Sequence, residues 1–371
     1  MKVLVTGAHG FLGQNLRLHL SERKDVIVAP FTRDNSFSEL PALLRDVDFI
    51  FHLAGINRPE DPSEFMTGNT DLTREICNAI IASGRTIPVI YTSSIQASQN
   101  NPYGVSKQAA EDLLLDLQSS TGNPVHVFRL PNVFGKWCKP NYNSVVATFC
   151  YNLTHALPIK INDPTRTLKL VYVDDVVNRF IQLMDGANRD VDDNGFEILY
   201  PQYTTTVGEL AHQLQAFKDS RANLTTERVG SGLVRALYST YLSYLSTNSF
   251  VYPVPLHGDA RGVFVEMLKT PDCGQFSYFT AHPGVTRGGH YHHSKTEKFL
   301  VIKGVAHFKF RQIHSDERFE LVVNGVVPMI VETIPGWTHE VTNIGDEEMV
   351  VMLWANEIID PTHPDTYACP L

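Results

Sequence analysis

The stretch KVLVTGAHGFLG, residues 2–13, decides the fold of the first part of the chain. A short β-branched apolar run ends directly in Gly7, and Gly10 and Gly13 follow it at intervals of three residues. Glycines at these places let a strand turn tightly into a helix, let the backbone approach a pyrophosphate, and point the helix N-terminus at the anion. The spacing predicts a dinucleotide-binding turn; the alternative is an ordinary strand–helix turn.

Strand-like and helical patterns alternate downstream of this turn. The strand-like runs are continuous and β-branched, as expected of strands buried on both faces. They cover residues 2–7, 25–30, 47–55, 87–94 and 125–135. Helical patterns cover residues 11–23, 103–122 and 230–246. Repeated strand–helix–strand units predict an α/β fold with a doubly wound parallel sheet and right-handed crossovers.

The pattern changes at about residue 250 to short strands separated by Gly and Pro. The expected strands cover residues 262–269, 275–282, 297–304, 305–313, 319–325, 329–336 and 348–357. Such a series is typical of an antiparallel barrel or sandwich. The chain is therefore expected to have a first domain at 1–245, a linker at 246–256 and a second domain at 257–371.

The composition excludes several classes of protein. The chain has 371 residues, with 31 Lys and Arg against 40 Asp and Glu, and a formal net charge of −9. It has no long basic run, so we expect neither nucleic acid nor an anionic membrane as a partner. The five cysteines are far apart and form no CxxC pair, which favours a reducing cytoplasm. We expect no secretory signal and no membrane-spanning segment, because the opening apolar run and all later ones are too short.

The second expected strand ends without an acidic residue. An enzyme that uses NAD usually has Asp or Glu there to bind the ribose 2′-hydroxyl. Thr32 and Arg33 follow instead, and an arginine suits the 2′-phosphate of NADP. We therefore predict NADP(H) as the cofactor; the alternative is a solvated arginine on a loop.

Tyr103 and Lys107 lie four residues apart at the start of an expected helix, so they share one face. A lysine cation beside a phenol lowers the pKa of the phenol. The phenol can then exchange a proton with an alcohol or carbonyl oxygen while a hydride moves. A hydroxyl donor is available just upstream, in the TSSIQ stretch that leaves the preceding strand. The alternative is a pair of ordinary surface residues.

Six motifs resemble, in order and spacing, those of the extended short-chain dehydrogenase/reductases that act on nucleotide sugars. They are TGAHGFLG, FHLAG, YTSSIQ, YGVSK, RLPNVFG and VYVDDV. The resemblance covers about residues 1–245 and implies a Rossmann-type domain. It implies that Tyr103 is the acid or base, that Lys107 orients Tyr103 and the nicotinamide ribose, and that Ser94 polarises the keto oxygen. Ser93 is the alternative to Ser94.

The same resemblance implies a set of binding residues. The expected cofactor-binding residues are Gly7, Gly10, Phe11, Leu12, Gly13, Thr32, Arg33, Leu53, Ala54, Gly55, Asn69, Tyr103 and Lys107. The expected substrate-binding residues are Ser94, Asn132 and Arg166. Arg166 is included because Leu168 stands where the family commonly has an arginine. Arg58 is a further candidate for phosphate or sugar, or is a solvated residue.

A cluster of histidines marks the second half, in the stretch RGGHYHHSKTEKFLVIKG, residues 287–304. On a strand, His290 and His292 point to one face and His293 to the other. Glu297 follows a short turn, and His339 lies on a later strand. Two or three histidines with one carboxylate suit Zn, Fe, Mn, Ni or Cu. The alternative is a polar surface strand.

The glycines and histidines of this region resemble the two motifs of the cupins. The fixed positions are Gly284, His290, His292, Glu297, Gly304, Gly336, His339 and Asn343. Pro335 and Met329 depart from the second motif. The resemblance covers about residues 252–371 and implies a jelly-roll barrel that binds a divalent metal, for which we expect zinc, through His290, His292, Glu297 and His339.

The same region also resembles the deoxysugar 3,5-epimerases, whose active histidine follows an R-G-x-H segment. That segment falls on residues 287–290. The resemblance implies that a base removes a proton beside a 4-keto group. A histidine that binds the metal cannot also take this proton. If His290 is a ligand, the remaining candidates for the base are Glu297, Lys298, His293 and Tyr291.

The whole chain resembles the bifunctional capsular polysaccharide synthesis enzymes of the UDP-N-acetyl-L-fucosamine pathway. The resemblance implies C3 epimerisation of a UDP-2-acetamido-2,6-dideoxy-4-ketohexose at the cupin. NADPH-dependent reduction at C4 then gives the UDP-2-acetamido-2,6-dideoxy-L-talose sugar. The alternatives are a reductase with a structural or metal-binding cupin, and a non-enzymatic NADP sensor with a metal-storing cupin. A homodimer through the cupin is expected.

Overall fold

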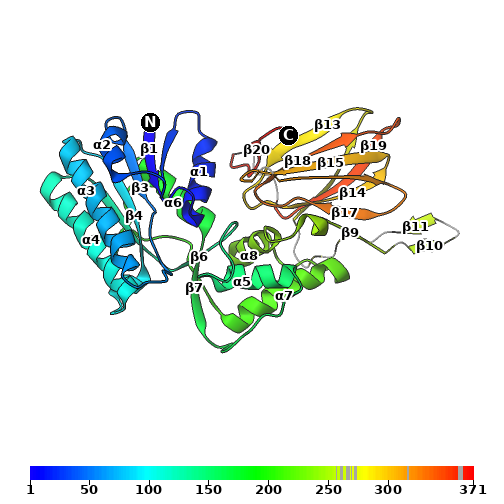
Figure 1. Cartoon of the computed structure of the whole chain (residues 1–371). Coiled ribbons are helices and arrows are strands. Elements are labelled where there is room, and N and C mark those ends of the chain that lie inside the picture. Colours follow the sequence, from blue (N-terminus) through cyan, green and yellow to red (C-terminus); the bar gives the residue numbers. More distant parts are fainter. Residues whose placement is uncertain are drawn as a thin grey trace. The chain divides into compact units, whose positions relative to one another are not determined.

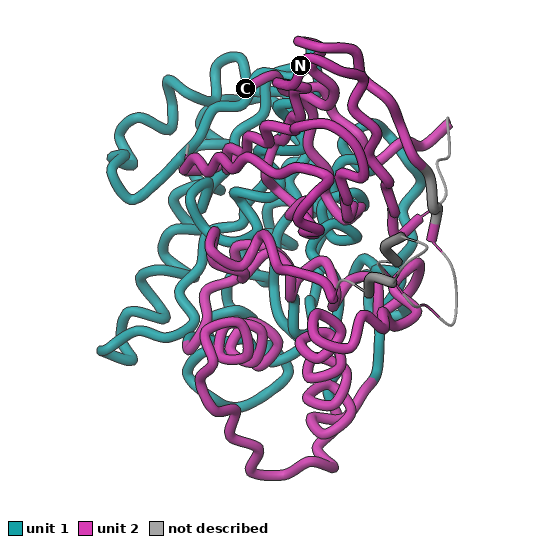
Figure 2. The backbone as a smooth tube through the Cα atoms, turned by 90° about the vertical axis from the view of Figure 1, so that its right-hand side faces the viewer, with its two compact units in different colours: residues 1–134, 142–144, 168–204 teal, residues 135–141, 145–167, 205–371 magenta. Residues whose placement is uncertain are grey.

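The computed structural model describes residues 1–255, 257–259, 262–264, 268, 270, 274–315, 317–357 and 362–371. The chain forms two compact units, each assembled from several stretches of sequence (Figure 2). Unit 1 contains residues 1–134, 142–144 and 168–204, and unit 2 contains residues 135–141, 145–167 and 205–371. The expected domain boundaries at 245 and 257 stay a prediction, because a compact unit is a different property from a domain boundary.

Unit 1 is built on a five-stranded parallel sheet in the order β2-β1-β3-β4-β5. Its strands are β1 (Lys2–Thr6), β2 (Ile27–Phe31), β3 (Phe49–His52), β4 (Val89–Ser94) and β5 (Val125–Leu130). This arrangement confirms the predicted Rossmann-like parallel sheet. The strand order reverses between β1 and β3, and ligands of such sheets bind at the carboxyl ends of the strands beside this point.

Helices cover both faces of this sheet (Figure 1). They are α1 (Phe11–Ser21), α2 (Leu40–Leu43), α3 (Leu72–Ser83), α4 (Pro102–Thr121) and α6 (Val173–Met184). α3 and α4 pack together on one face, and α1 and α6 on the other. The predicted helix at 103–122 is confirmed as α4. The Asn101 side chain caps its start by accepting the Gly104 N–H at 2.8 Å, and Gly122, at φ 77°, ends it.

The run at 125–135, predicted as one strand, forms two strands that belong to different sheets. β5 ends at Leu130, and β6 (Asn132–Phe134) pairs in parallel with β7 (Thr167–Tyr172), which also neighbours β8 (Tyr203–Thr206). Pro131 stands at the break. Proline has no backbone N–H to continue a ladder, so the sequence of the run already contained the signal for two strands.

Unit 2 contains two five-stranded antiparallel sheets, in the orders β12-β19-β14-β17-β9 and β16-β15-β18-β13-β20. The first contains β9 (Val251–Pro253), β12 (Gln275–Ala281), β14 (Glu297–Lys303), β17 (Met329–Glu332) and β19 (Met349–Ala355). The second contains β13 (Thr286–Tyr291), β15 (Val305–Gln312), β16 (Arg318–Asn324), β18 (Trp337–Asn343) and β20 (Tyr367–Ala368). The predicted all-antiparallel β region is confirmed.

Two details differ from the expected strands. β9 lies inside the stretch expected as a linker and pairs with β17. Of the strand expected at 262–269, residues 262–264 form β11 (Gly262–Phe264), which pairs with β10 (His257–Asp259). The remainder of that expected strand lies outside the described residues, except for residue 268.

Unit 2 also contains the helices α5 (Val145–Thr154), α7 (Val207–Asn223) and α8 (Gly232–Leu242). Alternate residues of its β-strands point into the core of the β region. Along β15, Ala306, Phe308 and Phe310 are buried and their neighbours are half-buried. Phe308 also contacts Phe299 of β14, with 5.5 Å between ring centroids. None of the helices in the described part of the chain combines the length and the apolar composition that a membrane span requires.

Candidate functional site

The glycine turn of unit 1 is packed too closely for side chains. Gly7 has φ +64°, and a Cβ there would lie 2.8 Å from the backbone of Ala54. A Cβ on Gly13 would lie 2.2 Å from the Gly7 carbonyl oxygen. Gly10 is the N-cap of α1, without a side-chain cap and without an acidic residue in the first turn. The turn therefore leaves the helix N-terminus available to an anion, as a dinucleotide requires.

A buried hydrogen-bond chain fixes the expected cofactor-lining segment after β3. The Thr6 hydroxyl accepts the N–H groups of Leu53 and Ala54, both at 3.1 Å, and donates to His52 Nδ1 at 2.8 Å. His52 Nε2 then donates to the Thr73 hydroxyl at 2.9 Å. Burial lowers the pKa of His52 to about 3, so the ring is neutral. His52 therefore supports this segment structurally.

Tyr103 and Lys107 lie one helical turn apart on α4, where Lys107 is buried and Tyr103 is half-buried. The Lys107 ammonium donates to the Thr92 carbonyl at 2.9 Å and lies 4.9 Å from the centre of the Tyr91 ring. Burial lowers the pKa of Lys107 to about 8. Burial also raises the pKa of Tyr103, and the Ser94 side chain opposes that change. Tyr103 is therefore protonated at neutral pH and able to donate.

The structure distinguishes the two neighbouring serines at the end of β4. The Ser94 side chain is near enough to the Tyr103 phenol to lower its pKa. Ser93 instead donates to Glu111, which is fully buried and forms an ion pair with Arg129 at 2.6 Å. Adjacent strand residues point to opposite faces, so only one of the two can reach the Tyr103 side.

Asn69 and Gly55 lie close to the Lys107 ammonium. A Cβ on Gly55 would lie 2.9 Å from both Lys107 Nζ and Asn69 Oδ1. The Asn69 amide accepts the Ile56 N–H at 2.8 Å and donates to the Ile56 carbonyl at 3.0 Å and to Ser106 at 2.9 Å. Asn69 thus fixes the loop that approaches Lys107.

The other expected binding residues are more exposed. Phe11 and Leu12 are half-buried in the first turn of α1, and Thr32 is half-buried just after β2. Arg33 and Arg58 are exposed. Asn132, in unit 1, is exposed and donates to the Lys169 carbonyl at 3.2 Å, while Arg166, in unit 2, is exposed. Leu168 is buried in β7, which explains why an apolar residue is tolerated there.

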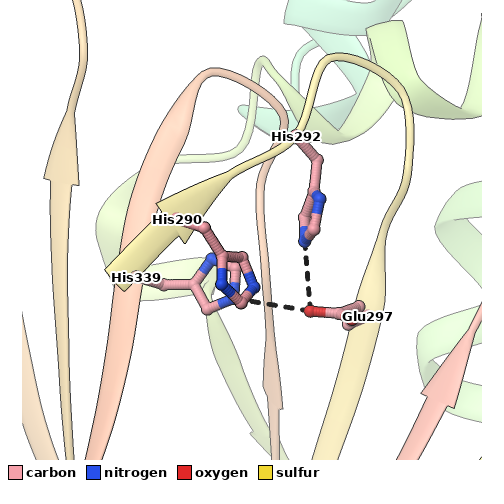
Figure 3. Close-up of side chains that lie close together, drawn as sticks. All are labelled: His290, His292, Glu297 and His339. Carbon is pink, nitrogen blue, oxygen red and sulfur yellow. Dashed lines mark hydrogen bonds and ion pairs between the residues drawn. The ribbon is translucent and has the colours of Figure 1, made fainter. Parts of the chain in front are cut away.

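Four side chains of unit 2 converge on one point (Figure 3). Each of His290, His292, Glu297 and His339 offers a ligand atom, and these atoms all lie within 4.8 Å of one another. Glu297 Oε2 lies 3.2 Å from His292 Nε2 and 3.4 Å from His339 Nε2. His290 and His339 are cross-strand neighbours on β13 and β18, whereas Glu297 begins β14 of the other sheet.

The spacing and charge of these side chains suit a small cation. Ligand atoms bound to tetrahedral zinc at 2.0–2.1 Å stand about 3.3–3.4 Å apart. Burial alone would raise the pKa of Glu297, but the adjacent His292 and His339 rings hold it well below its usual range. Burial lowers the pKa of His290 to about 4 and also lowers that of His339. A carboxylate at Glu297 and neutral imidazoles at His290 and His339 are the protonation states that a metal requires.

Lys295 also belongs to this site, although no motif in the chain singles it out. Its ammonium lies 3.0 Å from Glu297 Oε1, the carboxylate oxygen that faces away from the histidines, and its side chain is only 8% exposed. The two Glu297 oxygens therefore have different partners. Only a three-dimensional contact could have identified Lys295, because lysine is an uncommon neighbour in a metal-ligand motif.

The structure does not bring the other candidate bases into the four-residue cluster. Lys298 donates to Glu332 and, at 2.9 Å, to the Tyr252 hydroxyl. Burial alone would lower the pKa of Lys298, but the Glu332 carboxylate holds it well above its usual range, so Lys298 is a cation and not a base. Tyr291 and His293 pack their rings against Tyr367, with 5.5 and 4.9 Å between ring centroids, respectively.

Comparison with known proteins identifies the family of the chain. Residues 3–198, more than half of the chain, match the NAD dependent epimerase/dehydratase family. The chain belongs to this family. Residues 257–367 match the polysaccharide biosynthesis C-terminal domain. The two matches fall on the expected nucleotide-binding region and on the all-antiparallel β region, respectively.

Two individual relatives of this epimerase/dehydratase family member match its whole length, and a third matches part of it. It is 61% identical over 369 residues to the UDP-2-acetamido-2,6-beta-L-arabino-hexul-4-ose reductase of Pseudomonas aeruginosa, covering 100% of this chain and 98% of that protein. It is similar to the crystal structure of the capsular polysaccharide assembling protein CapF from Staphylococcus aureus, with a TM-score of 0.69, 41% identity and complete coverage of both chains. A UDP-glucose 4-epimerase from Thermotoga maritima, at 23% identity and a TM-score of 0.52, shares the fold over 59% of this chain.

Proposed function

We propose that the protein is a bifunctional nucleotide-sugar enzyme. Its Rossmann-like part reduces the C4 keto group of a UDP-2-acetamido-2,6-dideoxyhexose with NADPH, giving UDP-2-acetamido-2,6-dideoxy-L-talose. Its β region is a cupin jelly roll that first epimerises C3, and a homodimer through this region is part of the proposal. The observation that carries the reductase half is the set of buried Ser94, half-buried Tyr103 and buried Lys107, with Lys107 beside Gly55 of the segment that follows β3. The Pseudomonas relative, named as a reductase of a 4-keto UDP-sugar, supports the substrate class.

The residues of unit 1 divide the reduction between them. When bound, NADPH supplies the hydride that adds to C4. Tyr103 donates its phenolic proton to the C4 oxygen, so that the carbonyl becomes an alcohol. Ser94 hydrogen-bonds the same oxygen and polarises the carbonyl. The Lys107 cation stabilises the phenolate that Tyr103 leaves behind.

Arg33 is expected to set the preference for NADPH over NADH, because it is exposed just beyond β2, where no acidic residue ends the strand. Replacing Arg33 with alanine removes a cation from the 2′-phosphate, so KM for NADPH should rise about 10-fold to 100-fold while KM for NADH changes little. Steady-state kinetics with both cofactors measures this. Arg45→Ala, another exposed arginine of unit 1, is the matched control. An equal effect of Arg33→Ala on both cofactors would contradict the assignment.

The epimerase half rests on the cluster of His290, His292, Glu297 and His339. His339 Nδ1 and Nε2 are buried without a hydrogen-bond partner among the described residues, which suits a ligand whose partner is a metal. When bound, a divalent ion such as zinc supplies a Lewis acid for the C4 oxygen of the keto sugar. His290 is half-buried while the other three are buried, so it faces the more open side of the cluster. Removal of the C3 proton and its return to the opposite face invert C3.

Deuterium exchange tests the epimerase half directly. Incubation of the full-length protein with the 4-keto substrate in deuterium oxide, without NADPH, should place deuterium at C3, detected by mass spectrometry and NMR. Addition of NADPH should then give the C4 alcohol with deuterium still at C3. Absence of deuterium at C3 would favour the alternative, a reductase with a structural or metal-binding cupin. The name of the Pseudomonas relative mentions reduction alone and agrees with that alternative.

A further inference from the structure

The C-terminal segment of the chain, residues 362–371, runs beside the strand that contributes His290 (Figure 1). β20 pairs with β13, placing Ala368 opposite His290 and Tyr367 opposite Tyr291. The Cys369 N–H donates to the Gly289 carbonyl at 2.7 Å. A segment more than seventy positions away in sequence is thus hydrogen-bonded along the ligand strand.

Asp365 of this segment binds the loop between two of the four clustered residues. Its Oδ1 accepts the His293 N–H at 2.8 Å. Its Oδ2 accepts the N–H groups of Ser294 and Lys295, both at 2.7 Å, and the Ser294 hydroxyl at 3.0 Å. Three successive backbone N–H groups form a nest for an anion, and this nest is filled by the protein's own carboxylate. The Asp365 side chain is 13% exposed, so these bonds are largely shielded from water.

The backbone of Asp365 acts on His292 itself. The Asp365 carbonyl accepts from His292 Nδ1 at 2.5 Å, so Nδ1 carries a proton. In a ligand ring the lone pair is then on Nε2, the nitrogen that lies 3.2 Å from Glu297 Oε2 at the centre of the cluster. A carbonyl that holds the outer nitrogen of a ligand histidine fixes both its tautomer and its ring orientation.

We propose that Asp365 is a positioning residue for the metal-ligand cluster. Its carboxylate sets the path of residues 293–295, between His292 and Glu297, and its carbonyl sets the tautomer of His292. The C-terminal segment is therefore part of the site although it contributes no ligand. This inference rests on the metal centre of the proposed function. It does not depend on which residue is the epimerase base.

Metal affinity of the full-length protein tests this role, with Asp365→Asn as the variant. The amide is the same size as the carboxylate, but it has no charge. Its NH₂ group would also face backbone N–H groups whose hydrogen bonds the carboxylate accepts, so donors would face donors. The Kd for Zn²⁺, measured by competition with a chromogenic chelator, should rise about 10-fold to 100-fold. The visible spectrum of the Co²⁺ form should change in band position or intensity. Asp365→Glu, which keeps the charge, should lose less affinity than Asp365→Asn.

The matched control is Asp163→Asn, the same change at an aspartate of unit 2 that accepts the Thr165 N–H at 2.9 Å in another turn. It should leave the Kd for Zn²⁺ unchanged. Metal binding by the wild-type protein separates the two hypotheses. If the wild type binds no metal, the proposed metal centre is wrong. If the wild type binds and Asp365→Asn binds equally well, Asp365 only anchors the C-terminus and this inference is overturned. If Asp365→Asn does not fold, Asp365→Ala, which removes the carboxylate without adding a donor, takes its place, and an unchanged Kd for Zn²⁺ in that variant overturns the inference.

Discussion

Replacing Tyr103 with phenylalanine is expected to lower kcat for reduction at C4 by about 10³-fold, within the range for loss of a general acid. The substitution removes only the phenolic oxygen, so the ring can keep its contact with Phe65, at 5.6 Å between centroids. The proton for the C4 oxygen would then have to come from solvent in a buried site. Loss of NADPH absorbance measures the rate. Calorimetric titration with NADPH should give a Kd within about twofold of wild type, because the role of the phenolic oxygen is in the proton step.

The two serines provide a matched pair of controls for this prediction. Ser94→Ala removes the hydroxyl beside the Tyr103 phenol and should lower kcat about 10-fold to 100-fold. Ser93→Ala removes the donor to buried Glu111 and should lower thermal stability while leaving kcat close to wild type. A Tyr103→Phe protein that keeps more than a tenth of wild-type kcat, or a Ser93→Ala protein as slow as Ser94→Ala, would show that the acid has been assigned wrongly.

The contrast between these serines shows where sequence reasoning stops in unit 1. The glycine turn and the Tyr103–Lys107 pair are local: the spacing within one turn or one helix already determines which residues share a face. The choice between Ser93 and Ser94 is not local. It depends on Glu111, on a helix packed against the strand, and the identity of that partner follows only from the packing.

The β region shows the same division. Alternation along β14 places Glu297 and Lys298 on opposite sides of the strand, but it does not reveal that Glu332 is the partner of Lys298. Lys295 and Asp365 act through a turn and through a segment from the end of the chain, and neither has a periodic pattern. The all-antiparallel fold was predictable because short strands follow one another along the chain with Gly and Pro between them. The pairing of β9 with β17 was not, because a three-residue strand is too short to show a period.

Replacing Glu297 with glutamine is expected to remove the metal and to lower deuterium incorporation at C3 by at least about 10²-fold. Glu297 is the only anionic member of the four-residue cluster, and it is buried. Without its charge, three imidazoles would have to hold a divalent cation next to the Lys295 ammonium, which would have lost its counter-ion. A buried cation without a compensating charge is strongly unfavourable. Metal content is measured by atomic emission, and C3 exchange by mass spectrometry of the recovered sugar.

The reductase half and an exposed histidine–glutamate pair provide the controls for this variant. NADPH-dependent reduction of the C3-epimerised 4-keto sugar, supplied directly, should persist in Glu297→Gln because Tyr103, Ser94 and Lys107 are unchanged. Glu320→Gln breaks the exposed pair with His307, at 2.9 Å, and should retain both metal and exchange. Full exchange in a metal-free Glu297→Gln protein would separate epimerisation from the metal. Loss of both activities together would mean instead that the cluster is needed for folding. The supplied sugar is already epimerised, so losing the chemistry of the β region alone would not prevent its reduction.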